Sequence, residues 1–272
     1  MKLSWVDGEP AEGLSVHDRG LAYGDGLFET IRVRSGQPQL FERHLQRLQE
    51  GCSRLRLACD MAELRAEILA FSAALDEGVA KLILTRGEGE RGYAAPKGAP
   101  RRVLIASSAP SYPTRNADQG VQLFACTTRL AEQPQLAGLK HLNRLEQVLA
   151  RAEWQDPNFA EGLMRDTSGR VIEGVFSNIF LVSEGRLMTP VLERCGVAGV
   201  MRAELIELAR RSGVVVEIED VSIEQLLHAD EVFLCNSLFG IWPVQRLMTR
   251  HWSVGPLTRK LQHRLAKLPG NL

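Results

Sequence analysis

The sequence predicts a two-domain protein of the α+β or α/β class. Its 272 residues are enough for one large domain or two of moderate size. Segments with helical and with strand periodicity alternate along most of the chain. A stretch with two prolines and several turn-forming residues, 108–120, interrupts this alternation. We therefore expect a smaller N-terminal α/β domain at 1–110, an interdomain linker at 111–120 and a larger C-terminal domain at 121–272.

In the first domain, the hydrophobic pattern predicts alternating strands and helices. FETIRV at 28–33 and QLF at 39–41 favour a hairpin around the Ser-Gly-Gln-Pro turn between them. A helix follows to about Leu55, and the apolar spacing over 61–75 indicates a second, amphipathic helix. Two buried strands are expected at the apolar runs KLILTR and RVLIAS, at 81–86 and 102–107.

The second domain begins with a predicted strand at 120–129, and a helix is expected directly after Lys140. The remaining expected elements are two hairpin-like strand pairs at 162–174 and 178–190, a helix at 199–213 that Gly213 ends, a strand at 214–219, a helix that starts with the capping-box pair Ser222 and Gln225, and a last strand at 231–237.

Composition excludes several classes of protein. Lys plus Arg and Asp plus Glu number 33 each, so no charge excess points to nucleic acid or to an anionic membrane. Five cysteines without a C-x-x-C pair argue against a disulfide framework or a structural zinc site and favour a reducing compartment. The N-terminus lacks the apolar core of a signal peptide, and no stretch is long enough to cross a bilayer. We expect a cytoplasmic protein.

One motif resembles a nucleotide-binding loop but does not fit one. GEGERG at 87–92 matches G-x-G-x-x-G and follows a predicted strand. A dinucleotide fingerprint must open a helix, and the prolines at 96 and 100 prevent one here. A flexible loop is the better interpretation, from which Arg91 could reach a substrate carboxylate. The sequence also has no Walker loop and no HExxH motif, and we expect no metal site.

Lys140 is the leading candidate for a chemical role. A helix-flanking lysine is usually a surface residue, and that alternative stays open. Lys140, however, lies between a buried-type strand and an amphipathic helix, and Gly138 permits close approach of the backbone. A partly desolvated lysine loses its proton more readily and attacks carbonyl groups. The position therefore suggests Schiff-base chemistry.

Three other features would suit a phosphorylated carbonyl cofactor. The small residues of GVAGVMRAEL at 196–205 open a helix whose free N–H groups could bind phosphate, although a plain tight turn is an equal alternative. Asn236 and Ser237 follow a strand at its carboxyl end, where α/β proteins often bind ligands. Glu173 lies in an apolar strand region. It is either a solvated strand residue or a buried carboxylate that needs a cation, which a protonated pyridine nitrogen would provide.

Together these segments resemble the fold-type IV pyridoxal-phosphate enzymes, which include branched-chain and D-amino-acid aminotransferases and an aminodeoxychorismate lyase branch. The matches cover nearly the whole chain in the family's order, and the lysine segment is especially close to the lyase branch. They are DRGLAYGDGLFETIRV (18–33), HLQRL (44–48), RGEGERGY (86–93), GLKHLNRLEQV (138–148), EGVFSNIF (173–180), GVAGVMR (196–202) and ADEVFLCNSLFGIWPV (229–244).

The resemblance implies pyridoxal 5'-phosphate as the cofactor. Lys140, in the second domain, would bind it covalently and then shuttle protons, and Glu173 would pair with the pyridinium nitrogen. The phosphate would be bound by Arg47, the backbone amides of Val200 and Met201, and Ser237.

For the lyase branch, the implied reaction converts 4-amino-4-deoxychorismate to 4-aminobenzoate and pyruvate, a step of folate biosynthesis. The proton on the amine-bearing carbon would be removed, the enolpyruvyl group would leave by β-elimination, and Thr30 would supply a proton to it. Two departures from the aminotransferase pattern argue against transamination. No tyrosine follows the lysine in the 143–145 segment, and Met201 replaces a frequent threonine.

Two rival interpretations stay open at this stage. One is a D-amino-acid or branched-chain aminotransferase on the same fold, and the other is an oligomeric binding module with a degenerate site. The resemblance also implies a homodimer with sites near the subunit interface. The remaining partner is a small-molecule substrate, with no nucleic acid and no membrane.

Overall fold

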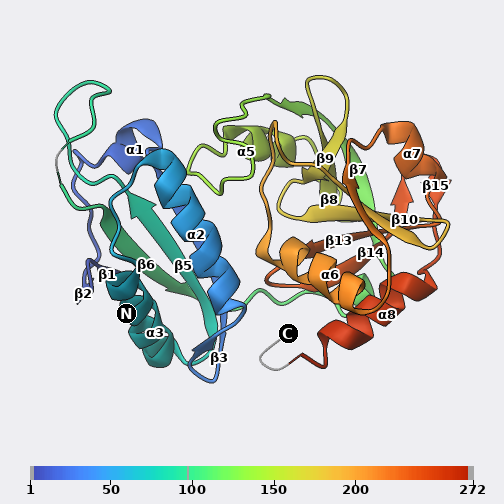
Figure 1. The fold of residues 1–272 in the computed structure, drawn as a ribbon, viewed down its shortest axis with the longest axis horizontal. Helices are drawn as coiled ribbons and strands as arrows, with labels where there is room; N and C mark the ends of the chain where they lie inside the picture. The colour runs from blue at the N-terminus through green and yellow to red at the C-terminus, as the bar shows by residue number, and fades with distance from the viewer. Residues whose placement is uncertain (1–2, 97, 269–272) are drawn as a thin grey trace. The chain divides into compact units, whose positions relative to one another are not determined.

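The computed structural model describes residues 3–96 and 98–268 and divides the chain into two compact units (Figure 1). Unit 1 is Met1–Pro110 with Leu139–Asn143, and unit 2 is Ser111–Gly138 with Arg144–Leu272. Each unit has its own sheet and its own hydrophobic core. The fold is mixed α/β in two parts, as the sequence predicts.

Unit 1 is built on a six-stranded sheet with the order β2-β1-β6-β5-β3-β4, in which all neighbours are antiparallel. Ser35 and Gly36 both have positive φ in the tight turn between β3 and β4. The predicted hairpin is present, but its second strand is Gln37–Pro38 and not 39–41, because Phe41 already begins a helix. The strands are β1 (Ser4–Val6), β2 (Glu9–Pro10), β3 (Gly26–Arg34), β4 (Gln37–Pro38), β5 (Gly78–Thr85) and β6 (Arg101–Ser107).

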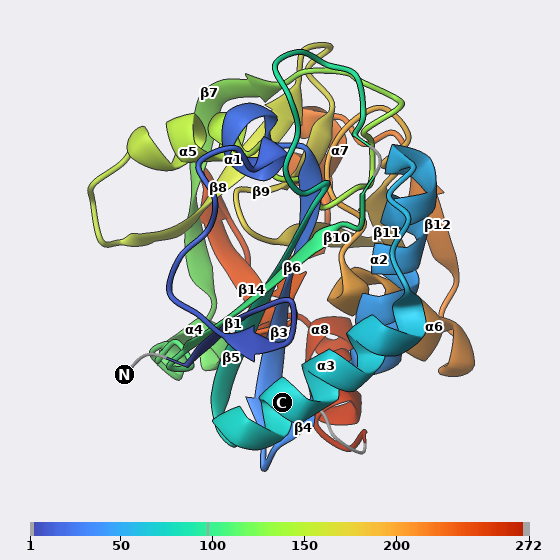
Figure 2. The ribbon, with the colours of Figure 1, turned by 90° about the vertical axis from the view of Figure 1, so that its left-hand side faces the viewer.

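Helices α2 (Phe41–Leu55) and α3 (Met61–Leu75) cover one face of this sheet (Figure 2), and the short helix α1 (Arg19–Tyr23) precedes β3. Asp60 caps α3 by accepting the Ala62 and Glu63 amides, which satisfies two N–H groups that the helix leaves unpaired. The apolar stripes of both helices join the inward residues of the sheet in one core. This burial confirms the two amphipathic helices that the sequence predicts.

Unit 2 is built on a nine-stranded sheet with the order β12-β11-β10-β13-β14-β7-β8-β9, and β15 pairs with β14. Because β9 also pairs with β10, the strands β10, β13, β14, β7, β8 and β9 form a closed ring, which removes their free edges. The strands are β7 (Val121–Leu130), β8 (Phe159–Asp166), β9 (Val171–Gly174), β10 (Asn178–Ser183), β11 (Arg186–Pro190), β12 (Val216–Glu219), β13 (Glu231–Asn236), β14 (Gly240–Leu247) and β15 (Arg250–His251).

Five helices surround this sheet, and α6 and α8 lie side by side against β13 and β14 (Figure 1). The predicted capping box at Ser222 and Gln225 is present, with both reciprocal hydrogen bonds. Gly213, with a φ of 75°, follows the end of α6 as predicted. The helices are α4 (Arg115–Asp118), α5 (Leu145–Ala152), α6 (Val200–Arg211), α7 (Ile223–His228) and α8 (Pro256–Leu265).

Three elements at the C-terminal end differ from the prediction. The sequence pattern makes 231–237 the last strand, yet β14, β15 and the helix α8 follow it. Proline normally argues against a central strand, because it cannot donate a ladder hydrogen bond. Pro243 is tolerated in β14 because pairing with the neighbouring β7 begins one residue later, at Val244.

The predicted boundaries need correction around Lys140 and around the linker. Lys140 is not in the second domain and does not open a helix, because α5 begins only at Leu145. Residues 139–143 are extended and group with unit 1, since His141 pairs with Leu27 of β3. Residues 111–120 belong to unit 2, where Arg259 donates to the carbonyl oxygens of Ala117 and Asp118.

Candidate active site

In unit 1, Lys140 is held against the start of β3. The Phe28 amide donates to the Lys140 carbonyl at 2.9 Å, and the Leu142 amide donates to the Gly26 carbonyl at 3.0 Å. The Lys140 ammonium lies 4.2 Å from the centre of the Phe28 ring, a cation–π distance. Lys140 is half-buried rather than fully exposed. Its backbone is fixed by a strand, and its side chain lies along an aromatic face.

Thr30 occupies the same face of β3 as Phe28. Side chains two residues apart on a strand point to the same side, about 7 Å from one another. Phe28 and Thr30 are both half-buried, whereas the intervening Glu29 is buried on the helix-covered face. Thr30 therefore shares its face of β3 with the ring that Lys140 contacts, and its role as a proton donor stays a prediction.

On the other face of β3, Glu29 forms a buried charged cluster with α2. It accepts hydrogen bonds from Arg47 Nε at 2.8 Å and from Arg47 Nη2, and it lies 2.6 Å from His44 Nδ1. Burial would raise the pKa of Glu29, but Arg47 and His44 outweigh it and lower the pKa to about 2. His44 is therefore a buried, hydrogen-bonded structural residue. The phosphate-binding role of Arg47 stays a prediction.

The segment around GEGERG contains no helix over residues 86–96, which agrees with its interpretation as a loop. Arg91 is exposed on this loop, and its contact with a substrate carboxylate stays a prediction. The loop is held by Arg19, which is buried and donates to the carbonyl oxygens of Gly92 at 2.9 Å and Tyr93 at 3.3 Å. Sequence reasoning did not assign a role to Arg19.

In unit 2, Glu173 is buried on β9, with 4% of its surface exposed. Its Oε2 accepts the Val197 amide at 2.8 Å and lies 3.5 Å from Asn178 Nδ2. Arg144 and Arg202 are near enough for its charge to act on both. Burial lowers the pKa of each guanidinium, while Glu173 opposes that shift. The buried alternative for Glu173, rather than the solvated one, is therefore confirmed.

Asn178 connects Glu173 to the start of α6. Asn178 Nδ2 donates to the Val197 carbonyl at 2.8 Å, and Asn178 Oδ1 accepts the Gly199 amide at 3.1 Å. A Cβ atom on Gly199 would lie 2.0 Å from Asn178 Oδ1, so this contact requires glycine. The EGVFSNIF motif contains Asn178, yet sequence reasoning assigned it no function.

The first turn of α6 presents the backbone groups that the sequence assigns to phosphate. Gly199 is the N-cap, no side chain caps the helix, and the first turn carries no acidic residue. The amides of Val200 and Met201 lie in this turn, where N–H groups have no acceptor within the helix. Such a terminus favours an anion. Ser237 is half-buried just after β13.

Comparison with known proteins identifies the family. The sequence model described as amino-transferase class IV matches residues 26–247. The chain belongs to the class IV aminotransferase family. It is 65% identical to 4-amino-4-deoxychorismate lyase from Pseudomonas aeruginosa, whose crystal structure superposes with a TM-score of 0.97 over 98% of this chain and 100% of that one.

Two curated members of the class IV family are also similar over nearly their full lengths. Aminodeoxychorismate lyase from Vibrio harveyi is 38% identical, with 97% of this chain and 99% of that protein covered. A putative branched-chain-amino-acid aminotransferase from Methanocaldococcus jannaschii is 30% identical, with 96% and 92% covered. The fold-type IV resemblance stated from the motifs is thus confirmed.

The predicted site residues discussed so far fall into one set in each unit. Unit 1 brings Lys140 and Thr30 to the same part of β3, and unit 2 brings Glu173 and the start of α6 together through Asn178. The chain links the two sets, since the Gly138 amide donates to the Gly196 carbonyl and Lys140 follows two residues later. The phosphate-binding role of Ser237 and the substrate-binding role of Arg91 stay predictions.

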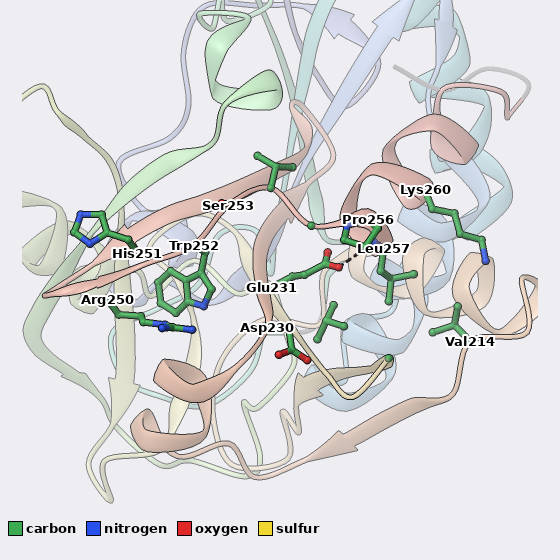
Figure 3. A pocket seen from close by; sticks show the side chains of 14 residues that line it. Val214, Asp230, Glu231, Arg250, His251, Trp252, Ser253, Pro256, Leu257 and Lys260 are labelled. Carbon is green, nitrogen blue, oxygen red and sulfur yellow. Dashed lines mark hydrogen bonds between the residues drawn. The ribbon is translucent and has the colours of Figure 1, made fainter.

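A pocket of about 720 Å³ in unit 2 is lined by none of the predicted site residues (Figure 3). Its lining includes Glu231, which points at the start of α8 and accepts the amides of Leu257 and Thr258 and the Thr258 hydroxyl. That carboxylate therefore caps a helix. Within 3–96 and 98–268, no group of His, Cys, Asp or Glu could hold a metal ion, and no helix could span a membrane.

Proposed function

We propose that this protein is a pyridoxal-phosphate-dependent 4-amino-4-deoxychorismate lyase that releases 4-aminobenzoate and pyruvate. The observation that carries this proposal is the 65% identity, over 98% of the chain, to the Pseudomonas aeruginosa lyase. Lys140 contacts the Phe28 ring, and Thr30 lies two residues from Phe28 on the same face of β3; these positions support the same assignment, because the reaction needs a base and a proton donor.

The residues present fit the cofactor that class IV enzymes use. Glu173 is a buried carboxylate that would face the protonated ring nitrogen, and the Val197 amide fixes its orientation. The uncapped start of α6 offers the Val200 and Met201 amides to a phosphate. Arg47 and Ser237 are proposed to bind the same phosphate. When bound, pyridoxal phosphate supplies an aldehyde that reacts with amines and a ring that withdraws electrons.

The roles proposed for the protein's own groups follow from their surroundings. Lys140 Nζ would hold the cofactor and then take the proton from the amine-bearing carbon of the substrate. Its attachment to β3 limits the positions that the amine can reach, which favours transfer from one carbon. The Thr30 hydroxyl would donate a proton to the departing enolpyruvyl group. Arg91, on its exposed loop, would pair with a substrate carboxylate.

The test is incubation of the purified protein, loaded with pyridoxal phosphate, with 4-amino-4-deoxychorismate. We expect 4-aminobenzoate fluorescence to rise together with an equal amount of pyruvate. A parallel incubation with D-alanine or a branched-chain amino acid and 2-oxoglutarate tests the aminotransferase alternative, which would produce glutamate. Glutamate formation without 4-aminobenzoate would overturn the proposal in favour of the aminotransferase.

We also propose that two copies form a dimer in which the apolar face of α5 is covered. Leu145, Val148 and Leu149 are 75%, 60% and 60% exposed, respectively, although the sequence spaces them as a buried helical face. Light scattering should give twice the chain mass of 30.2 kDa, and Leu149→Glu should shift the protein toward monomer. A wild-type protein of single-chain mass would contradict the dimer.

A cytoplasmic location is proposed because all five cysteines are free thiols.

A further inference from the structure

Glu161, on β8, is a buried carboxylate that the proposed reaction does not use. It has no exposed surface and accepts hydrogen bonds from four groups. Its Oε1 accepts the amides of Gly162 at 2.8 Å and Val175 at 3.0 Å. Its Oε2 accepts the amide of Phe176 at 3.2 Å and the hydroxyl of Ser177 at 2.7 Å. Three of the four donors belong to one short segment, 175–177.

That segment is the turn that joins β9 to β10. The Gly174 amide donates to the Ser177 carbonyl at 2.7 Å and closes the turn. Glu173 lies directly before the turn and Asn178 directly after it, and the two residues are paired across the strands. These are the residues that hold Val197 and Gly199. A shift of the turn would therefore move both of them.

The surroundings leave the Glu161 carboxylate little room to move. A Cβ atom on Gly174 would lie 2.3 Å from Ser177 Oγ and 2.9 Å from Glu161 Oε2. Glycine at position 174 lets the turn close directly over the carboxylate.

The energetics of Glu161 argue against a role in stability alone. Burial raises its pKa to about 7, and the four neutral donors offset only part of that shift. Its charged form is therefore disfavoured in the folded protein. A glutamine of similar size would avoid this cost but could not accept from all four donors, so the carboxylate is explained by the donors that it holds in place.

We propose that Glu161 is a positioning residue for the cofactor: by anchoring the 174–177 turn through four hydrogen bonds, it places the Glu173 carboxylate and the Asn178 amide that orient the cofactor ring and the start of α6. This inference rests on the proposed function, specifically on the role of Glu173. Glu161 acts through these two residues and contacts no reacting atom.

The test compares Glu161→Gln with a matched control, Glu231→Gln. Both carboxylates are buried in unit 2 and accept backbone amides and one hydroxyl. Glutamine keeps the size in each case, but its NH2 group must face at least one N–H donor. Glu231 caps α8, whereas Glu161 holds the turn beside Glu173. Apo protein is titrated with pyridoxal 5'-phosphate and followed by visible absorbance, and the melting temperature of each apo variant is measured.

We expect both substitutions to lower the melting temperature. Only Glu161→Gln should weaken cofactor affinity, by about 10-fold or more, and shift the pH midpoint of the visible band, because small displacements of an orienting group are costly. Equal affinities for the two variants would overturn the inference. If Glu161→Gln does not fold, Ser177→Ala removes one of the four donors and should weaken affinity less, and unchanged affinity in that variant would overturn it.

A third variant separates this inference from the proposed function. Glu173→Gln should itself change cofactor affinity and the visible band. If it changes neither, the role of Glu173 is wrong and the function of Glu161 falls with it. If Glu173→Gln has its effect and Glu161→Gln behaves like Glu231→Gln, only the positioning role of Glu161 is wrong.

Discussion

Two buried glutamates, one in each unit, are held in opposite ways. Glu29 in unit 1 is 2% exposed and is paired with the cation Arg47 and with His44, and its pKa is about 2. Glu161 in unit 2 is fully buried and accepts only neutral donors, and its pKa is about 7. Burial raises the pKa of both. For Glu29 the charges and hydrogen bonds of Arg47 and His44 outweigh that effect, whereas for Glu161 the four neutral donors offset only part of it.

The same contrast extends to the two sets of site residues. Around β3, unit 1 gathers charged side chains, including Lys140 and Arg47. Around Glu173, the direct contacts in unit 2 are the Val197 amide and Asn178, and the charges of Arg144 and Arg202 act from nearby. We infer that unit 1 supplies the groups that transfer protons and that unit 2 supplies the groups that orient the cofactor. The following predictions test this division, beginning with the largest expected effect.

Lys140→Ala should abolish the chemical step while leaving intact the contacts by which unit 2 is proposed to orient the cofactor. Turnover should fall by about 10³-fold or more, since the same amine is proposed both to bind the cofactor and to move the proton. Pyridoxal phosphate should still bind, but noncovalently and with an altered visible spectrum. Mass spectrometry after borohydride reduction should find the label on wild-type Lys140. Full activity in the variant would contradict the assignment.

Glu29→Gln should be strongly destabilising, because it leaves the Arg47 charge in a buried site without its carboxylate. Removing one partner of a buried ion pair costs about 3–5 kcal/mol. The control is Arg65→Met, which breaks the exposed pair between Arg65 and Glu42 and should cost less than about 1 kcal/mol. Urea denaturation measures both free energies of unfolding. Equal losses of unfolding free energy in the two variants would show that the buried Glu29 cluster stabilises the protein no more than an exposed ion pair does.

The two glutamates should give stability opposite dependences on pH. The pKa of Glu29 is depressed from 4.5, so its contribution is present above pH 4.5 and is lost as the pH falls through about 2. The pKa of Glu161 is raised from 4.5, so its contribution is present below pH 4.5 and is lost as the pH rises through about 7. The second change is on the order of 3 kcal/mol.

Comparing wild type with Glu161→Gln at about pH 5 and about pH 8 isolates this second change. The neighbouring groups that sense Glu161 do not titrate in this range. Burial, and then Glu161, raise the pKa of Tyr112, and burial with Glu153 and Glu161 raises the pKa of Cys126 to about 12. The variant should lose most of the pH dependence between these two values. An unchanged dependence would mean that another group is responsible.

Thr30→Val should slow turnover by about 10²-fold, the usual contribution of one proton donor, without changing cofactor affinity. Valine keeps the β-branched shape that suits a strand but removes the hydroxyl. Thr30→Ser, which retains the hydroxyl, is the matched control and should keep most of the activity. Single-turnover measurements of 4-aminobenzoate release would detect the difference. A weaker affinity for pyridoxal phosphate in Thr30→Val would indicate a binding role instead.

Much of the local structure followed from the sequence. Helix α3 has the predicted bounds, and the capping box of α7 was read from two residues. Both depend on contacts within a few positions, where periodicity and capping preferences are informative. Strand β14 was missed because Pro243 counts against a strand, and the pairing that accommodates it lies far away in the chain, on β13 and β7.

The candidate site was only partly predictable for the same reason. Lys140 and Glu173 stood out because a lysine and a carboxylate in apolar surroundings are unusual. That His141 pairs with β3, placing Lys140 in unit 1, could not be derived from local pattern. Nor could the partners of Asn178 and Glu161, which come from turns and strands distant in sequence.

The sequence by itself therefore determined the class of fold, most of the elements and the residue types available for chemistry, because these depend on periodicity and composition. The tertiary structure alone decided which unit holds Lys140, which faces of β3 carry Thr30 and Glu29, and which donors surround each buried carboxylate. Whether burial or a partner controls the charge of such a group depends on atoms a few ångströms away in space, and these are seldom neighbours along the chain.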